Sequence, residues 1–261
     1  DAGQINYAIT GVGGAINAIL QGSKSKIVGF GEARAATAGY LVPVDSPIKS
    51  YKDIKGKTIA FASPGGYTHW IALASIRAAG LQASDVKLLP AGGSPEAYAA
   101  VLAGAADAFH ATDGTGSIMV TQGKVRWGWK DTDVIPQLPS SCIYVSEREI
   151  NDRPDQLKAF LKVYQRADEY IVSNLDDALV MWTSHPKVAQ AGMTLDIARK
   201  LGELYPIPKE AWTTKLNVEA LQTTENLMLE TNVIKAKVAW DKVIDQRFLR
   251  EDLQRVDLSK L

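Results

Sequence analysis

The stretch FASPGGYTHWIALASIRAAG, from Phe61 to Gly80, decides how this chain folds. Its β-prone start runs into Pro-Gly-Gly, which cannot continue a strand, and apolar residues at helical spacing follow as far as the last glycine. The stretch therefore predicts a strand, a glycine-rich turn and an amphipathic helix. Backbone N–H groups and the positive end of the helix dipole then meet at the turn, as in an anion-binding site. A tight turn that binds nothing is the alternative, because such turns are common in α/β proteins.

Neither glycine-rich turn of the chain carries a nucleotide-binding motif. The P-loop pattern GxxxxGK[ST] is absent, and neither Gly65 nor Gly66 is followed by Lys-Ser or Lys-Thr. The other turn begins at Gly11 and lacks the third glycine of the dinucleotide fingerprint, because Ile16 stands in its place. The sequence therefore favours a small anion over a nucleotide.

The composition narrows the class of protein and of partner. The chain has 261 residues, enough for one large domain or two smaller lobes, and its 46% hydrophobic and 22% charged residues are typical of globular proteins. Its 29 basic residues balance 29 acidic ones, so no net charge attracts nucleic acid. We therefore expect no nucleic-acid partner.

Cysteine and histidine are too sparse for a predicted metal centre. The lone Cys142 excludes an internal disulfide and a multi-cysteine site, and we interpret it as a small buried side chain on a strand, with a reactive thiol as the alternative. The three histidines, at positions 69, 110 and 185, are far apart in sequence and lack zinc-binding spacing. We expect neither a metal nor a cofactor.

The chain shows no membrane-spanning or secretory segment. No run approaches about 18 apolar residues, and no signal peptide is present. Asp1 is not a natural start, so we expect a mature or truncated form.

Predicted strands and helices alternate up to about residue 145, and from Arg153 onward helices follow one another, the first with Pro154 at its amino end. This alternation predicts an α/β protein with mixed, mostly parallel sheets and covering helices. Trp127 and Trp129 are expected to pack on one strand face. The expected strands are 5–10, 26–31, 39–44, 58–62, 87–90, 106–111, 125–129 and 141–145; the expected helices include 14–21, 51–55, 94–103 with Ser94 as N-cap, 117–122, 176–184, 194–204 and 217–231; residues 131–140 are expected to form a loop.

Four segments, in order along nearly the whole chain, resemble the periplasmic substrate-binding proteins of ABC importers for sulfonates, nitrate and taurine. The second is the most specific, because it combines a lobe-crossing strand, the run DSPIKSYKDIKGKTIA and the glycine-rich turn with its histidine. The segments are INYAITGVGGAINAILQGSKSKIVGF, LVPVDSPIKSYKDIKGKTIAFASPGGYTHWIALASIRAAGL, DVKLLPAGGSPEAYAAVLAGAADAF and LNVEALQTTENLMLETNVIKAKVAWDKVIDQRFL.

The resemblance implies a two-lobed, type II binding-protein fold with two crossing strands. Residues 1–41 and 146–261 would form the first lobe, and residues 42–145 an inserted second lobe. The crossings would lie around residues 40–44 and 141–145, and would allow closure on a ligand. Family members begin with a strand, a helix and a second strand that have no counterpart in this sequence.

The resemblance also implies which residues bind the ligand. Two glycine-rich turns would face the cleft from opposite lobes, so that an anion gains from two helix dipoles. These residues are Thr10, Gly11, Val12 and Gly13 in the first lobe, and Ser63, Gly65, Gly66, Tyr67, Thr68 and His69 in the second.

A third group follows the strand ending at residue 111, where the family often has an aromatic platform. Here His110, Thr112 and Asp113 occupy that stretch. Asp113 would face an ammonium or hydroxyl group, or else would cap the next helix. Arg34, near the first crossing, would clamp a carboxylate or sulfonate, or else would be a solvated loop residue.

The implied function is that of a monomeric solute receptor that delivers a small organic anion to the permease of an ABC importer. It would act in the periplasm or, lipid-anchored, outside the cell. The alternative is an enzyme on the same fold, similar to a desulfinase with a Cys/His/Arg site or to pyrimidine-synthesising proteins with clustered cysteines. The cysteine cluster is absent here, and Cys142 with His69 or His110 is the pair that remains. A sensor domain with the same cleft is a third hypothesis.

Overall fold

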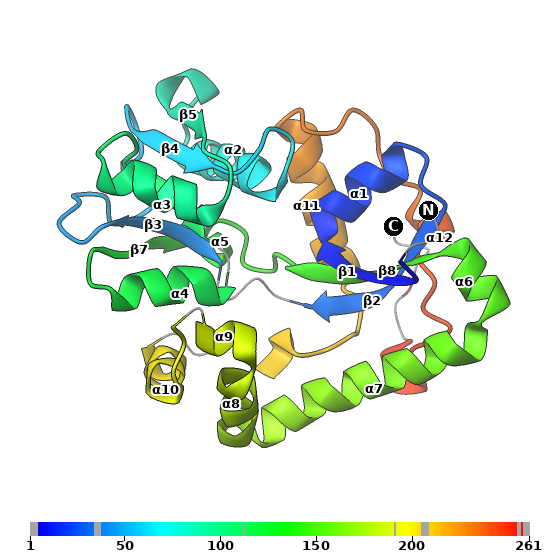
Figure 1. The fold of residues 1–261 in the computed structure, drawn as a ribbon. Helices are drawn as coiled ribbons and strands as arrows, with labels where there is room; N and C mark the ends of the chain where they lie inside the picture. The colour runs from blue at the N-terminus through cyan, green and yellow to red at the C-terminus, as the bar shows by residue number, and fades with distance from the viewer. Residues whose placement is uncertain are drawn as a thin grey trace. The chain divides into compact units, whose positions relative to one another are not determined.

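The structure is a computed structural model of the chain and describes residues 5–33, 38–111, 113–190, 192–204, 209–254 and 257. The chain divides into two compact units (Figure 1). Unit 1 comprises residues 1–35, 137–175 and 208–261, and unit 2 comprises residues 36–136 and 176–207. Each unit has its own sheet and its own core.

Unit 1 is built on a three-stranded sheet in the order β1-β8-β2. Both outer strands run antiparallel to the central one, with Thr10 opposite Cys142 on one side and Phe30 opposite Cys142 on the other. In Figure 1, the long helix α7 covers one face of the sheet, and α1 with α11 lies over the other. The elements are β1 (Tyr7–Gly11), α1 (Val12–Leu20), β2 (Ser25–Glu32), β8 (Ser141–Ser146), α6 (Glu147–Asp152), α7 (Pro154–Ser173), α11 (Val218–Glu230) and α12 (Trp240–Val243), with 3-10 turns at Lys209–Ala211 and Glu251–Leu253.

The core of unit 1 forms where α7 meets the sheet. Leu157 and Leu161, one turn apart on α7, pack against Val28, Ile143 and Val145. The helix begins at Pro154, as the sequence predicts. Proline fits the first turn because the N–H group that it lacks would have no intrahelical acceptor there. Asn217 caps α11 by accepting a hydrogen bond from the N–H of Ala220, which confirms that helix start as well.

Unit 2 is built on a five-stranded mixed sheet in the order β5-β4-β6-β3-β7. Helix α2 covers one face, and α3 with α4 covers the other (Figure 1). The elements are β3 (Gly39–Pro43), β4 (Thr58–Phe61), α2 (Tyr67–Ala78), β5 (Lys87–Pro90), α3 (Ser94–Leu102), β6 (Ala108–Ala111), α4 (Asp113–Thr121), β7 (Val125–Lys130), α5 (Asp131–Val134), α8 (Leu175–Ser184), α9 (Pro186–Gln190) and α10 (Leu195–Leu204), with 3-10 turns at Tyr51–Asp53 and Ala83–Asp85.

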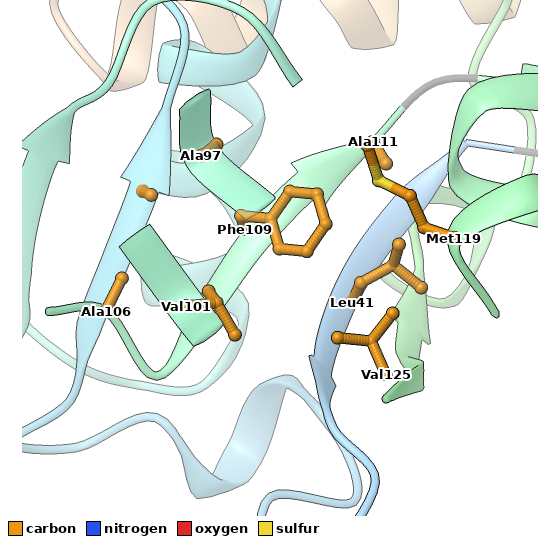
Figure 2. Close-up of a cluster of buried hydrophobic side chains, with 9 residues drawn as sticks. Leu41, Ala97, Val101, Ala106, Phe109, Ala111, Met119 and Val125 are labelled. Carbon is orange, nitrogen blue, oxygen red and sulfur yellow. The ribbon is translucent and has the colours of Figure 1, made fainter. Parts of the chain in front are cut away.

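Figure 2 shows the core under α3 and α4. Phe109 of β6 lies between Val101 of α3 and the side chains of Leu41 and Met119, and all four are buried. Burying side chains of this size stabilises the unit by about 1.5–3 kcal/mol each before entropy is counted. This cluster supports the strands from the face opposite α2.

The expected predominance of parallel strands is wrong. Among the described strands, two pairs are parallel, β4 with β5 and β4 with β6. The other four pairs are antiparallel. The reason is that β3 and β8 return against the direction of both their neighbours.

Several local expectations are also corrected. Residues 131–134, expected in a loop, form the short helix α5. Helix α3 is capped by Gly93, so Ser94 is its first residue. Helix α4 starts at Asp113, four residues before its expected start at residue 117.

Trp127 and Trp129 do not share a face of β7. Trp127 packs on the cluster of Figure 2, whereas Trp129 stacks on Tyr40, with ring centroids 4.3 Å apart, and donates to Ser75 of α2. The register of β3 and β7 shifts between Tyr40 and Leu41, and such a bulge reverses the alternation of side chains.

Residues 176–207 group with unit 2, whereas the expected lobes placed everything after residue 145 in the first lobe. Helix α10 packs against α4 (Figure 1), where Ile118 lies against a buried cluster that includes Ala198 and Leu201. Asp176 of α8 pairs with Arg199 of α10 at 2.7 Å.

Within the described part of the chain, no helix combines the length and hydropathy needed to cross a membrane.

Candidate functional site

The turn between β4 and α2 is shaped by its two glycines. Gly65 has φ +77°, a left-handed conformation that glycine adopts without strain. Gly66 is extended and serves as the N-cap of α2, and its N–H donates to the carbonyl of Ser63 at 3.1 Å. The backbone is thus held in a tight loop directly before the helix.

The amino end of α2 is capped by no side chain. The carbonyl of Gly66 accepts hydrogen bonds from the N–H groups of His69 and Trp70. No acidic residue lies in the first turn, so nothing there neutralises the positive end of the helix dipole. A helix end of this type attracts anions.

Two side chains of the first turn are oriented as hydrogen-bond donors. The Thr68 hydroxyl oxygen accepts from the N–H of Ala62 at 2.8 Å, which leaves its own proton to donate elsewhere. His69 Nδ1 accepts from the N–H of Gly65 at 3.1 Å, so its proton is on Nε2. Burial lowers the pKa of His69, and its ring stacks on Phe61 at 4.8 Å. His69 is therefore a neutral N–H donor at pH 7.

Behind this turn lies a buried carboxylate. The Tyr67 hydroxyl donates to Asp131 Oδ2 at 2.6 Å, and His110 Nε2 lies 2.9 Å from the same oxygen. Since the carboxylate can only accept, His110 donates through Nε2. The side chains of His110 and Asp131 have no exposed surface. Asp131 thus ties the first residue of α2 to strand β6.

Aromatic rings enclose this network. Tyr40 packs edge-on against His110, with centroids 4.9 Å apart, and Tyr67 does so at 5.5 Å. Burial, followed by the negative charge of Asp131, raises the pKa of the Tyr40 hydroxyl well above its usual range. His110, expected to touch the ligand, is thus packed inside unit 2. Asp131 was missed by the sequence analysis, because nothing in DTDV marks it as more than a loop residue.

The other glycine-rich turn, in unit 1, is chemically plainer. Thr10 and Gly11 end β1, and Gly11 is the N-cap of α1, again without a side-chain cap. Val12 and Gly13 are buried. The end of α1 offers backbone N–H groups, and the polar side chain in this turn is that of Thr10.

The remaining expected site residues are less informative. Arg34 and Thr112 lie outside the described residues. Asp113 is the first residue of α4, so the structure places it inside the helix rather than at the N-cap position before it.

Cys142 is placed as the sequence predicts, as a buried residue on a strand. Burial raises the pKa of its thiol to about 12, so the thiolate needed for nucleophilic attack is scarce at neutral pH. Cys142 belongs to unit 1, whereas His69 and His110 belong to unit 2. Among the described residues, no three His, Cys, Asp or Glu side chains are grouped to hold a metal ion.

The fold is shared with solved structures of binding proteins. The periplasmic aliphatic sulphonate binding protein SsuA from Escherichia coli matches with 24% identity and a TM-score of 0.74, over 97% of this chain and 82% of that one. The alkanesulfonate-binding protein SsuA from Xanthomonas axonopodis pv. citri, bound to MOPS, matches with 21% identity and a TM-score of 0.75, over 93% and 81% of the two chains.

An enzyme has the same fold. The desulfurization enzyme DSZB matches with 17% identity and a TM-score of 0.71, over 95% of this chain and 85% of that one. At these identities the matches establish a periplasmic-binding-protein fold for this chain. A search of curated proteins gave no match.

A family model identifies the chain more directly. The model described as NMT1/THI5 like matches residues 1–178 of the 261. The match covers both glycine-rich turns, the strand that carries Cys142 and all of α7. Since it spans more than half of the sequence, the chain belongs to the NMT1/THI5-like family.

Proposed function

We propose that the protein is the solute receptor of an ABC importer and binds a small organic anion, a sulfonate or a carboxylate. The amino end of α2 carries this proposal, since it offers backbone N–H groups, the Thr68 hydroxyl and the neutral His69 donor at one turn. Donors without a full counter-charge suit an oxyanion that must also be released to a transporter. SsuA proteins that share the fold are named for binding sulfonates.

The proposed ligand-binding residues also include the turn at Thr10–Gly13 in unit 1, where the end of α1 offers backbone N–H groups. The receptor would act as a monomer in the periplasm, or anchored by lipid outside the cell, and would hand its solute to a permease. Nitrate and taurine remain candidate solutes alongside larger sulfonates.

We further propose that the protein does not transform its ligand. The contrary hypothesis is an enzyme similar to DSZB, which requires a reactive group on this fold. Cys142 is the thiol available, and burial keeps it protonated. A thiol reagent should therefore react slowly with the folded protein and should leave ligand affinity unchanged.

A thermal-shift screen tests the receptor function. It would cover alkyl and aryl sulfonates, carboxylates, nitrate, taurine and pyrimidines, each with its uncharged analogue. A ligand at 100 times its Kd adds about 2.7 kcal/mol to the free energy of unfolding, which is readily visible. We expect at least one anion class to stabilise the protein, and no product by mass spectrometry after incubation. Failure of every anion would refute the proposal, and a product would establish an enzyme.

A further inference from the structure

Several backbone N–H groups around the amino end of α2 already have acceptors, and one of these acceptors can be titrated. The N–H of Gly66 donates to the carbonyl of Ser63, and those of His69 and Trp70 donate to the carbonyl of Gly66. The N–H of Gly65 instead donates to an imidazole nitrogen, Nδ1 of His69, at 3.1 Å. A carbonyl oxygen accepts at every physiological pH, whereas Nδ1 accepts only while the ring is neutral. The bond between Gly65 and His69 is therefore sensitive to pH.

The His69 ring is accessible to protons, but its surroundings do not favour a positive charge. The side chain is partly exposed, and its ring stacks on Phe61 of β4 with centroids 4.8 Å apart. Residues 58–66, which form β4 and the turn, carry no charged side chain. Tyr67 is the titratable neighbour in the first turn of α2, and its hydroxyl is bonded to Asp131 at 2.6 Å.

Two effects oppose a proton on His69 when no ligand is bound. Burial lowers the pKa of His69. The positive end of the α2 dipole also disfavours an imidazolium. An anion bound beside the ring would reverse this balance, because an opposite charge stabilises the protonated form.

Protonation would change both partners of the hydrogen bond. The proton adds to Nδ1 while Nε2 keeps its own, so the ring becomes a donor at both nitrogens. The bond that breaks is the one from the N–H of Gly65, since Nδ1 no longer has a lone pair to offer. Two N–H groups then point into the same space, and an oxyanion that accepts from both of them resolves the conflict.

We propose that Gly65 and His69 form a proton-dependent switch, in which proton uptake at Nδ1 releases the Gly65 N–H to the ligand, so that the receptor binds its anion more tightly at lower pH. This inference rests on the proposed function, because it places the anion at the α2 turn. Proton and anion must favour each other reciprocally: the factor by which the anion strengthens proton binding equals the factor by which the proton strengthens anion binding.

The test measures affinities for butanesulfonate and for nitrate by calorimetry at pH 8 and pH 5. Both anions stay ionised over this range, so a change in affinity reports on the protein. Buffers that carry a sulfonate or a carboxylate are avoided, because they would compete for the site. We expect the Kd of the native protein to be about five- to tenfold lower at pH 5, which corresponds to roughly tenfold stronger proton binding by His69 in the complex.

Two histidine variants separate the switch from other titrating groups. His69→Gln keeps a polar side chain that takes up no proton in this range, so its affinity should be the same at both pH values. His185→Gln removes an exposed histidine between α8 and α9 and should keep the native gain. A gain that persists in His69→Gln would overturn the proposal.

A second arm needs no variant. Nitrogen-15 NMR of the native protein follows the His69 ring and the Gly65 amide between pH 8 and pH 5. We expect the Gly65 signal to move with the same midpoint as the His69 ring, and butanesulfonate to displace that midpoint to higher pH. A Gly65 amide that does not respond to the titration of His69 would overturn the proposal even if His69→Gln failed to fold.

The outcomes distinguish this inference from the proposed function. If the anions bind equally well at both pH values, the switch is refuted and the receptor function stands. If no anion of the thermal-shift screen binds, yet the Gly65 amide follows His69, the proton-dependent release of Gly65 stands and the receptor function is refuted. If no anion binds and the amide does not respond, both are refuted.

Discussion

Two glycine-rich turns, one in each unit, begin helices of similar length but differ in chemistry. The turn before α2 holds Thr68 and His69 in place through hydrogen bonds from the N–H groups of Ala62 and Gly65. The turn before α1 places Val12 and Gly13 in the interior and has Thr10 as its polar side chain. Both helices lack a side-chain cap.

An exposed helix end is therefore not by itself a recognition element. The α1 turn can offer only a dipole and backbone donors, which do not distinguish one anion from another. The α2 turn adds oriented donors, and Asp131 supports it from behind. We therefore expect anion discrimination to come mainly from unit 2.

The largest expected effect comes from Gly66→Val. A Cβ at this position would lie 3.0 Å from the hydroxyl and 3.3 Å from the carbonyl of Ser63, and the branched side chain would block the backbone donors. We expect anion affinity to fall by about a hundredfold or more in calorimetry, as for the loss of two hydrogen bonds to a charged group.

The matched substitution in unit 1 is Gly11→Val. The nearest atom to a Cβ there is the carbonyl of Ser140 at 3.8 Å, an ordinary contact. It should therefore weaken binding much less than Gly66→Val. Equal losses of affinity from both substitutions would show that the two turns contribute equally to anion binding.

Asp131→Ala should mainly reduce stability. It removes the acceptor of both Tyr67 and His110, and buried donors that lose a carboxylate are left unpaired. We expect the free energy of unfolding to drop by about 3 kcal/mol in urea titrations. Asp133→Ala, which removes only an exposed acceptor for the N–H of Lys130, should cost about 1 kcal/mol. A drop no larger than that of Asp133→Ala would show that the buried network does not support α2.

Thr68→Ala and His69→Ala should each weaken binding of an anion by about 1–3 kcal/mol, the usual loss for a hydrogen bond to a charged group. The loss should be much smaller for an uncharged analogue of equal size, and calorimetry with the two ligands distinguishes them. Thr10→Ala is the control in the other turn and should cost less. Wild-type affinity in both α2 variants would refute the site assignment.

Stability should also depend on pH, and titratable groups in the two units should act in opposite directions. Burial, followed by the charge of Glu169, raises the pKa of Asp168 on α7 from 3.8 to about 7, so the folded state keeps this proton at pH values where the unfolded state has lost it. The free energy of unfolding should therefore fall as the pH rises between these two values. The pKa of His69 is lowered from 6.5, so the unfolded state binds that proton more readily and stability falls as the pH drops below about 6.5.

Urea titrations between pH 4 and 8 would separate the two contributions. Asp168→Asn should remove the loss at higher pH, and His69→Gln should remove the loss at lower pH. If either variant kept the full pH profile of the native protein, the corresponding group would not be responsible.

Short-range sequence signals were sufficient to predict most of the local elements and the family resemblance. The strand, turn and helix from Phe61 to Gly80 form as expected, because proline, glycine and the spacing of apolar residues act over short distances. The α/β class, the position of Cys142 and the start of α7 at Pro154 were likewise predictable. The assignment of ligand-binding residues stays a prediction.

Which distant residues come into contact depends on the tertiary structure. The bond from Tyr67 to Asp131 joins positions 64 apart, and that from His110 to Asp131 joins positions 21 apart, so no local pattern announces either. The opposite faces of the two tryptophans follow from a register shift between paired strands, and the grouping of residues 176–207 follows from packing against α4. The burial of Asp168 has the same origin, since α7 packs on a sheet whose outer strands, β1 and β2, lie more than 100 residues away in sequence. Side-chain burial and pairing of this kind depend on long-range packing, whereas secondary structure responds to its immediate neighbours.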